Sequence, residues 1–428
     1  MTDRDAVGTM AERFTATYRI ETPRSAREAA EAMAGEQSAS TFVDVEAETA
    51  DLQERHGGDV VDVTEIGRAP EPTLPGATPE PGDVDEYVRA EVTLSLPLEN
   101  VGVSVPNLRT AIAGNVFELQ SLSGVRVLDV DVPPEYGEEC PTPAFGVDGT
   151  RELIGVRDRP LIGTIIKPSV GLAPEETASL VETLVEAGVD FIKDDELIAD
   201  PPYSPFEDRV EAVMSVINDH EAETGKKVMY AFNVTGDVEE MIHRHDVVRD
   251  AGGTCVMVSL NSVGLAAVRE LRRHAELPIH GHRNGWGALS RCPQLGFEYT
   301  AYQKLWRLVG VDHLHVNGLE NKFAESDESV IASARAVQDP IPGDDGALPV
   351  FSSGQWAKQA PATYERLGNA DLLYLSGGGI MGHPGGPADG VAALKQGWEA
   401  ATSGIPLEEY ARDHEELRAS MEAFGDDE

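Results

Sequence analysis

The chain has 428 residues, of which 75 are acidic and 34 basic, so its formal net charge at pH 7 is −41. A surface this negative repels nucleic-acid phosphates and anionic lipids. No apolar run reaches the ~20 residues that a membrane-spanning helix needs, and the first residues are charged, unlike a signal peptide. These features exclude nucleic-acid and membrane roles and predict a cytoplasmic protein.

Lysine is scarce in this chain, because only 8 of the 34 basic residues are lysines. Excess carboxylate with little lysine predicts adaptation to concentrated salt, where charge repulsion is screened. A lysine inside a motif therefore carries more weight here than in an average protein. The 3 cysteines are widely spaced and match neither a disulfide framework nor a zinc site.

The first part of the chain mixes strand-like and helix-like stretches and predicts a small α+β domain. In chain order the pattern predicts a strand over 13–20, a helix over 25–33, an irregular proline-rich loop over 68–87, a strand over 88–96 and a helix over 107–119. A second group of prolines between 131 and 148 indicates a linker. We therefore expect an N-terminal domain over 1–142 and a second domain over 143–428, which ends in an acidic tail.

Beyond the linker, short apolar runs alternate with amphipathic stretches of helical length. The apolar runs cover 161–166, 189–195, 227–234, 254–260, 278–283, 313–317, 348–354 and 372–378. Helical candidates include 174–187, 205–223, 262–275, 299–309 and 388–401. Such strand–helix units, eight within about 250 residues, are typical of a (β/α)₈ or TIM barrel. A doubly wound open sheet is the alternative, but no glycine-rich fingerprint follows the first strand.

Barrel enzymes carry their chemistry at the C-terminal ends of the strands. The second predicted strand ends in Lys193-Asp194-Asp195-Glu196, a cluster that desolvates badly unless a cation shares the site. Strand alternation places Lys193 and Asp195 on one face, and Glu196 follows at the turn. The cluster predicts oxygen ligands for a hard cation such as Mg²⁺, with a solvated acidic turn as the alternative.

Other strand ends carry histidines and small residues. His282 and His315 each lie two residues after another histidine, so both members of each pair face one side of their strand. The loops at 352–354 and 377–379 follow the last two strands, where barrels commonly bind phosphate, and Arg283 offers a fork-shaped donor for a second phosphate. The alternatives are buried core histidines and plain turns.

These motifs together resemble one family. The segments at 163–172 and 190–196, together with the later histidines and glycine loops, are similar in order and spacing to the large chain of ribulose-bisphosphate carboxylase/oxygenase (RuBisCO). In the N-terminal part, the stretches around Glu36 and Asn115 resemble segments that reach a neighbouring subunit's active site. The resemblance covers essentially the whole chain and implies a ferredoxin-like N-terminal domain before the barrel.

The resemblance also implies roles for single residues. Lys193 would be carbamylated by CO₂ and would bind Mg²⁺ together with Asp195 and Glu196. The metal would acidify a substrate carbon, and the product would be an enediolate. Lys167 would polarise the carbonyl oxygen and later handle protons, and His282 would orient hydroxyl groups.

The same resemblance implies which residues contact the phosphates of the substrate and which reach the partner subunit. The implied phosphate contacts come from Arg283 and His315 at one end and from Ser352, Ser353, Gly354, Gly377 and Gly378 at the other. Lys322 would sit on a mobile loop that closes over the substrate. Glu36 and Asn115 would complete the partner chain's site, which implies a homodimer or a multiple of dimers acting on a phosphorylated sugar.

Departures from the carboxylase pattern indicate which subgroup of the family the chain resembles. Carboxylases carry lysine where this chain has Ser169 and tryptophan where it has Phe42, and Asn115 stands where the related methionine-salvage enolases place a lysine base. The chain therefore resembles a RuBisCO-like protein of form IV. We expect a Mg²⁺-dependent enzyme that enolises a phosphorylated keto-sugar or keto-acid, ending in isomerisation, decarboxylation or transcarboxylation. The alternatives are a genuine carboxylase and a non-catalytic phosphosugar-binding protein.

Overall fold

A computed structural model describes residues 12–39, 45–74 and 84–425 and divides the chain into two compact units. The first unit contains Met1–Cys140 and Trp286–Leu308, and the second contains Pro141–Gly285 and Val309–Glu428. Phe42, part of the proline-rich loop and the last three residues of the acidic tail lie outside the described residues.

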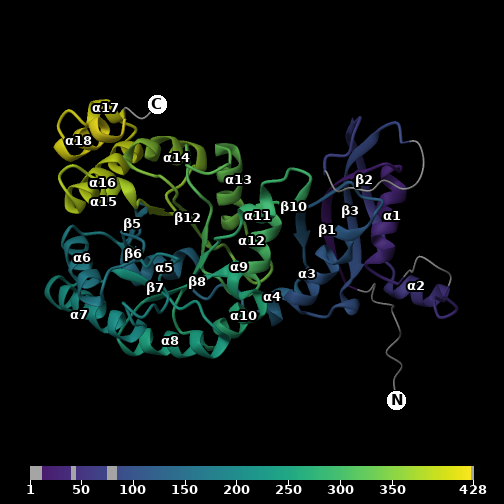
Figure 1. The fold of residues 1–428 in the computed structure, drawn as a ribbon, viewed down its shortest axis with the longest axis horizontal. Helices are drawn as coiled ribbons and strands as arrows, with labels where there is room; N and C mark the ends of the chain where they lie inside the picture. Colours follow the sequence, from purple (N-terminus) through teal and green to yellow (C-terminus); the bar gives the residue numbers. More distant parts are fainter. Residues whose placement is uncertain (1–11, 40–44, 75–83, 426–428) are drawn as a thin grey trace, which may run out of the picture. The chain divides into compact units, whose positions relative to one another are not determined.

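The first unit is a sheet of five strands with helices, in purple to blue in Figure 1 apart from its later segment. Its elements up to residue 140 are β1 (Arg13–Thr22), α1 (Ala26–Glu36), α2 (Ala50–His56), β2 (Asp59–Ala69), β3 (Tyr87–Pro97), α3 (Val105–Ala113), β4 (Gly124–Asp131) and α4 (Glu135–Glu139). The strand order β4-β1-β3-β2 is that of a ferredoxin-like fold, which confirms the predicted α+β class.

Local signals explain several of these elements. Alternate residues of β1 are buried, as its period-two pattern predicts. Helix α1 begins with a capping box, in which the Ser25 hydroxyl accepts from the Glu28 backbone N–H and the Glu28 carboxylate accepts from the Ser25 backbone. The helix expected over 107–119 is interrupted at Gly114, where a Cβ would lie 2.5 Å from the Thr110 carbonyl oxygen. A 3₁₀ turn follows over Asn115–Glu118.

The later segment of this unit was expected to belong to the barrel domain. It contains α11 (Gly287–Ser290), β10 (Leu295–Phe297) and α12 (Tyr299–Arg307). Strand β10 pairs in parallel with β4. The Arg126 guanidinium, which is almost fully buried, donates to the carbonyl oxygens of Ser290, Cys292 and Leu295 and pairs with Glu298 at 2.8 Å. These contacts explain why the segment belongs to the first unit.

The second unit is the predicted barrel. Its eight parallel strands are β5 (Leu161–Ile165), β6 (Phe191–Lys193), β7 (Met229–Asn233), β8 (Cys255–Ser259), β9 (Ile279–His282), β11 (His313–His315), β12 (Leu348–Phe351) and β13 (Leu373–Leu375). They form a closed ring in which β13 pairs with β5. Each of the eight apolar runs in the sequence contains one of these strands, which confirms the expected fold class.

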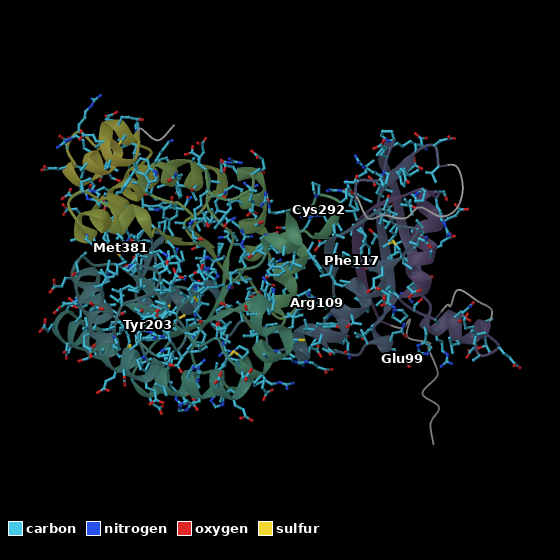
Figure 2. All side chains as sticks on the ribbon, in the orientation of Figure 1. Glu99, Arg109, Phe117, Tyr203, Cys292 and Met381 are labelled. Atoms are coloured by element: carbon cyan, nitrogen blue, oxygen red, sulfur yellow. The ribbon has the colours of Figure 1, made fainter. Side chains whose placement is uncertain are left out.

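Helices follow most of the strands and surround the ring, as Figure 1 shows in teal to yellow. They are α5 (Gly146–Ile154), α6 (Pro174–Glu186), α7 (Phe206–Thr224), α8 (Val238–Asp250), α9 (Leu260–Val263), α10 (Leu265–His274), α13 (Asp327–Gln338), α14 (Ala360–Leu367), α15 (Gly378–Met381), α16 (Pro387–Ser403), α17 (Leu407–Tyr410) and α18 (Glu415–Phe424). Oxygen-tipped side chains project outward from them in Figure 2, as the acidic composition requires. Among the described residues no helix is both long and apolar enough to span a membrane.

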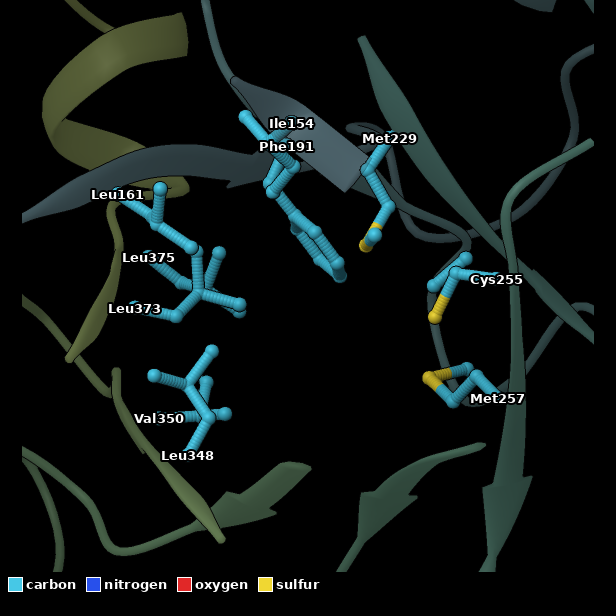
Figure 3. Close-up of a cluster of buried hydrophobic side chains, with 11 residues drawn as sticks. Ile154, Leu161, Phe191, Met229, Cys255, Met257, Leu348, Val350, Leu373 and Leu375 are labelled. Atoms are coloured by element: carbon cyan, nitrogen blue, oxygen red, sulfur yellow. The ribbon is translucent and has the colours of Figure 1, made fainter. Parts of the chain in front are cut away.

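The barrel interior is filled by side chains from alternate strand positions. Figure 3 shows this cluster, in which the side chains from the separate strands lie toward one another. Its members are Ile154, which is the last residue of α5, and the strand residues Leu161, Phe191, Met229, Ala231, Cys255, Met257, Leu348, Val350, Leu373 and Leu375. Gly163 belongs to this packing, because a Cβ there would lie 2.6 Å from Leu375 and 2.8 Å from the Phe191 carbonyl oxygen. This part of the core is therefore apolar and closely packed.

A chain of buried polar side chains crosses one side of this interior. The Thr150 hydroxyl lies 2.8 Å from His313 Nε2, and His280 lies between His313 and His315, at 3.4 Å and 2.8 Å. All four side chains are buried. Burial lowers the pKa of His313 to about 3, from an ordinary value of 6.5. His313 is therefore neutral in the folded protein at neutral pH.

We predict that His313 makes the folded state sensitive to mild acid. The unfolded chain binds a proton at this residue below about pH 6.5, whereas the folded chain does not, so the stabilisation is complete above that pH and is lost as the pH falls towards the folded value. In His313→Gln the pH slope of the free energy of unfolding should be shallower by up to about 1.4 kcal/mol per pH unit below pH 6. Urea unfolding at several pH values measures the slope.

His243→Gln is the control, because it removes a largely exposed histidine from α8. Its slope should match that of the unchanged protein. Identical slopes in His313→Gln and the unchanged protein would contradict the prediction.

Candidate active site

The C-terminal ends of β5 and β6 bring two lysines and two acids together. Strand pairing sets Ile165 beside Lys193, so Lys167 follows at the same end of the barrel. The Lys167 ammonium donates to Asp195 Oδ2 at 2.6 Å and to the Ser169 hydroxyl at 2.7 Å. Lys193 Nζ lies 3.7 Å from Glu196 Oε2. Four of the residues expected at the reacting centre are therefore neighbours.

Lys193 is a buried amine, with 1% of its side chain exposed. Its ammonium donates to the Asp194 carbonyl oxygen at 2.7 Å. Burial lowers the pKa of Lys193, although the charges of Glu196 and Asp195 oppose that effect. Lys193 consequently loses its proton to give the neutral amine more readily than an exposed lysine does.

The pKa of Asp195 falls as well, but here the neighbouring charges outweigh the effect of burial. Burial alone raises the pKa of a carboxyl group, but the hydrogen bond and charge of Lys167, with the charge of Lys193, outweigh it, and the pKa of Asp195 falls below its ordinary value. Asp195 is therefore a carboxylate and a suitable ligand for a hard cation.

Asp194 points away from this group, as strand alternation predicts. Its carboxylate accepts from the Tyr230 hydroxyl at 2.7 Å, from the Asn233 backbone N–H at 3.0 Å and from the Arg209 guanidinium at 3.3 Å. The Asn233 side chain in turn donates to the carbonyl oxygens of Asp195 and Glu196. These contacts hold the turn after β6, and the supporting roles of Arg209, Tyr230 and Asn233 were not predicted.

The two predicted histidines lie beside the lysine and acid group. His282 Nε2 lies 3.5 Å from Glu196 Oε2, and the His282 and His315 ring centroids are 4.5 Å apart. Burial and the Lys193 charge together lower the pKa of His282 to about 4, although the Glu196 charge acts against both. Burial likewise places the pKa of His315 well below its ordinary value. Both imidazoles are therefore neutral at neutral pH and have one donor and one acceptor nitrogen each.

The loops after β11 and β12 meet beside His315. His315 Nδ1 lies 3.1 Å from the Ser352 hydroxyl, and the Ser353 hydroxyl donates to Asn317 Oδ1 at 2.9 Å. Asn317 and Ser353 both adopt the left-handed conformation, with φ of 70° and 75°. Left-handed conformations in residues other than glycine are uncommon and cluster at functional sites. Asn317 was not singled out in the sequence.

Two glycines of the predicted phosphate loops lie close to lysines. A Cβ at Gly377 would lie 3.6 Å from Lys167 Cε, and a Cβ at Gly354 would lie 3.9 Å from Lys322 Cβ. A Cβ at Gly378 would meet only open space. Lys322 itself is exposed, with its ammonium 5.3 Å from the centre of the Phe323 ring. Backbone amides and lysines thus lie on the same side of the barrel, where an anion can bind.

Arg283 is engaged with a carboxylate that sequence analysis did not identify. Its guanidinium donates to Glu325 Oε2 at 2.7 Å, and both side chains are largely buried. The Asn317 amide also donates to Glu325 Oε2. Glu325 follows Lys322 by three residues in the same loop, but sequence separation alone gives no sign that it reaches Arg283.

Glu36 and Asn115 belong to the first unit and lie together there. Glu36 is the last residue of α1, and the Asn115 amide donates to Glu36 Oε1 at 3.4 Å. The interruption at Gly114 ends α3 and begins the turn that carries Asn115. The pair is therefore formed within one unit, independently of the barrel residues.

The donor set at the end of β6 fits the Mg²⁺ ion that the resemblance implies. Asp195 and Glu196 supply hard carboxylate oxygens, and the buried Lys193 amine lies 3.7 Å from Glu196 Oε2. Among the described residues His245, Asp246 and His274 form another possible metal cluster. There, however, His245 Nε2 accepts from the Glu276 backbone N–H and the Arg249 guanidinium pairs with Asp246, so the cluster is already neutralised.

Comparisons with known proteins agree with these motifs. Residues 146–424 match the family model of the ribulose bisphosphate carboxylase large chain, catalytic domain, and residues 10–136 match the model of its N-terminal domain. The chain is 54% identical to the 3-oxo-isoapionate-4-phosphate transcarboxylase/hydrolase of Xanthobacter autotrophicus, over 96% of this chain and 99% of that protein. It is 48% identical to the 3-oxo-isoapionate-4-phosphate decarboxylase of Rhizobium etli, over 96% and 99% of the two chains.

Among solved structures, a rubisco-like protein from Burkholderia fungorum superposes with a TM-score of 0.89 at 46% identity, covering 96% of this chain and 100% of that one. The predicted RuBisCO-like enzyme is thus confirmed. The chain belongs to the ribulose bisphosphate carboxylase large-chain family, as a RuBisCO-like enzyme.

Proposed function

We propose that this enzyme removes or transfers the carboxylate of a phosphorylated 3-oxo sugar acid of the 3-oxo-isoapionate 4-phosphate class. The observation that carries the proposal is the group formed by Lys167, Lys193 and Asp195 at the ends of β5 and β6. The names of the two relatives supply the substrate class. Both names imply cleavage of the bond to the carboxylate carbon.

The chemistry of such a substrate suits these residues. In a 3-oxo acid the bond between the carboxylate carbon and its neighbour breaks, CO₂ leaves, and the electron pair passes into the ketone to give an enolate. Lys167, an ammonium at the strand end, would stabilise the oxygen that becomes negative and would return a proton to the carbon. The neutral His282 and His315 would hold the substrate's hydroxyl groups.

A bound Mg²⁺ ion would supply Lewis-acid polarisation of the substrate oxygens. Asp195 and Glu196 would hold the ion, and Lys193 would add a third anionic ligand after carbamylation. In that reaction the amine lone pair bonds to the carbon of CO₂ and one N–H proton is released. Burial of Lys193 favours the neutral amine that this reaction needs. The carbamate and the ion are inferred from the family together with this donor set.

The single phosphate would bind at the loops after β12 and β13. Ser352, Ser353 and the amides of Gly354, Gly377 and Gly378 are available there, and Lys322 would cover the bound substrate. Support comes from the open space at Gly378 and from the position of Gly377 beside Lys167.

The alternative of a genuine carboxylase is disfavoured by Ser169. Adding CO₂ to an enediolate creates a new carboxylate, which needs fixed positive charge around it. Here Lys167 Nζ lies 2.7 Å from a neutral hydroxyl where the carboxylases carry a second ammonium.

A cytoplasmic location and adaptation to concentrated salt remain predictions from the composition.

The substrate experiment uses the whole enzyme with Mg²⁺ and bicarbonate. We expect 3-oxo-isoapionate 4-phosphate labelled with ¹³C at its carboxylate to lose or transfer that carbon, as followed by NMR. Ribulose 1,5-bisphosphate with labelled bicarbonate is the comparison arm, in which we expect no phosphoglycerate to form. Inertness towards the first compound together with carboxylation of the second would refute the proposal.

Lys193 gives a second test. Lys193→Met keeps the volume of the buried side chain but cannot form a carbamate. We expect kcat to fall by about 10²-fold to 10³-fold while the fold is retained. Lys227→Met is the control, because Lys227 precedes β7 and pairs with Glu221 at the opposite end of that strand from the candidate site, so its loss should leave activity unchanged. The unchanged enzyme should also lose activity in CO₂-free buffer and regain it with bicarbonate. Full activity without CO₂ would contradict the carbamate.

The pairing of Glu36 with Asn115 leads to a proposal about assembly. We infer that this pair completes the barrel site of a second copy, so the enzyme acts as a homodimer or a multiple of dimers. Two-fold symmetry then gives two equivalent sites per dimer, each built from both chains.

Mixed dimers test this assembly. Glu36→Gln and Lys193→Met chains should each be nearly inactive, but a randomly mixed population should recover about a quarter of the normal activity, since half of the dimers are hybrids with one intact site of two. Co-expression with two different affinity tags yields the hybrids, and sizing chromatography checks their mass. A fully active monomer, or hybrids without activity, would exclude the shared site.

A further inference from the structure

The Glu325 carboxylate lies against the guanidinium group of Arg283. Its Oε2 atom accepts from the Arg283 guanidinium at 2.7 Å and also from the Asn317 amide, and its Oε1 atom accepts from the Ser329 hydroxyl at 2.9 Å. Only 6% of the Arg283 side chain and 12% of the Glu325 side chain are exposed. Both oxygens of the carboxylate are therefore engaged with donors and largely removed from water.

This arrangement differs from an ordinary surface ion pair. Exposed pairs contribute little and exchange readily with solvent, whereas a buried pair is costly to break because one charge is left without its partner. The Asn317 amide is itself held in place, because its oxygen accepts from Ser353 and its backbone is in the left-handed conformation. The donors around Glu325 thus form a ready-made anion site that a residue of the protein already fills.

The two predicted phosphate positions consequently differ in charge. At the loop after β13, Gly377 lies beside the Lys167 side chain, and a Cβ at Gly378 would meet open space. At the end of β9, the charge of Arg283 is balanced by Glu325. A phosphate dianion placed against Arg283 would also face that carboxylate, and like charges at such distances repel strongly when they are shielded from water.

We propose that Glu325 takes the place of a second phosphate and makes this site selective for substrates with one phosphate. The inference rests on the proposed function, which it deepens by assigning a specificity-determining residue. Glu325 acts by excluding an anion and takes no part in bond breaking. A bisphosphate would have to displace the carboxylate from three donors before it reached Arg283.

The test measures binding without turnover. Isothermal titration of the whole enzyme, with Mg²⁺ and bicarbonate present, compares ribulose 1-phosphate, ribulose 5-phosphate and ribulose 1,5-bisphosphate, which share one carbon skeleton. In the unchanged protein the bisphosphate should bind no more tightly than the better monophosphate. In Glu325→Gln the affinity for the bisphosphate should rise by at least about tenfold, with the better monophosphate changed by less than about threefold.

Glu328→Gln is the matched control. It removes the same charge three residues along, from a side chain that is 80% exposed and pairs with Arg366. The control should leave the affinity ratio of bisphosphate to monophosphate unchanged. A general effect of net charge would instead shift both variants equally and overturn the proposal.

Two further results would overturn it. One is an unchanged protein that binds the bisphosphate at least about tenfold more tightly than either monophosphate, which would mean that Glu325 moves aside. The other is a correctly folded Glu325→Gln protein, verified by circular dichroism, with an unaltered ratio. The comparison in the unchanged protein decides the matter even if the variant unfolds. Because no reaction is followed, failure here is distinct from failure of the decarboxylation experiment.

Discussion

Closure of the eight parallel strands is the constraint on which the site depends. In a closed ring every second residue must face inward, and the pairing registers set inward residues opposite inward residues of the neighbouring strand. Phe191 and Lys193 therefore face the same interior, one in the apolar core and the other at its end. The same periodicity places Asp194 on the outer side, against Arg209 and Tyr230. The site thus continues the core packing pattern.

Burying so many polar groups is tolerated because nearly all of them are paired. Lys167 and Asp195 compensate each other, and the buried histidines form a hydrogen-bonded series with Thr150 and Ser352 at its ends. Burial also keeps those imidazoles neutral, so they can serve as donors and acceptors without adding repulsion next to Lys193. Packing and chemistry therefore depend on the same desolvation.

Local sequence patterns predicted the barrel strands, the α+β class of the first domain and the residues at the strand ends, because apolar runs and strand-end motifs are short-range features. The ferredoxin-like fold was expected only from the family resemblance. Contacts between distant residues were not predictable in this way. Strand β10 joins the first unit through Arg126, which contacts residues more than 160 positions away in the chain. Likewise the loop position of Glu325 is visible in the sequence, but its contact with Arg283 appears only after β9 and β11 are adjacent.

Under the proposed function, the charge balance of the site also accounts for the expected difference from a carboxylase. A carboxylase must hold two phosphates and stabilise a carboxylate that forms, so it needs several cations around the substrate. Here Ser169 replaces one ammonium and Glu325 neutralises Arg283. A site with less net positive charge holds a carboxylate less firmly and favours the release of CO₂ from it. Under the proposed function the site has one phosphate to anchor and one carboxylate to expel, and the reduced positive charge suits both demands.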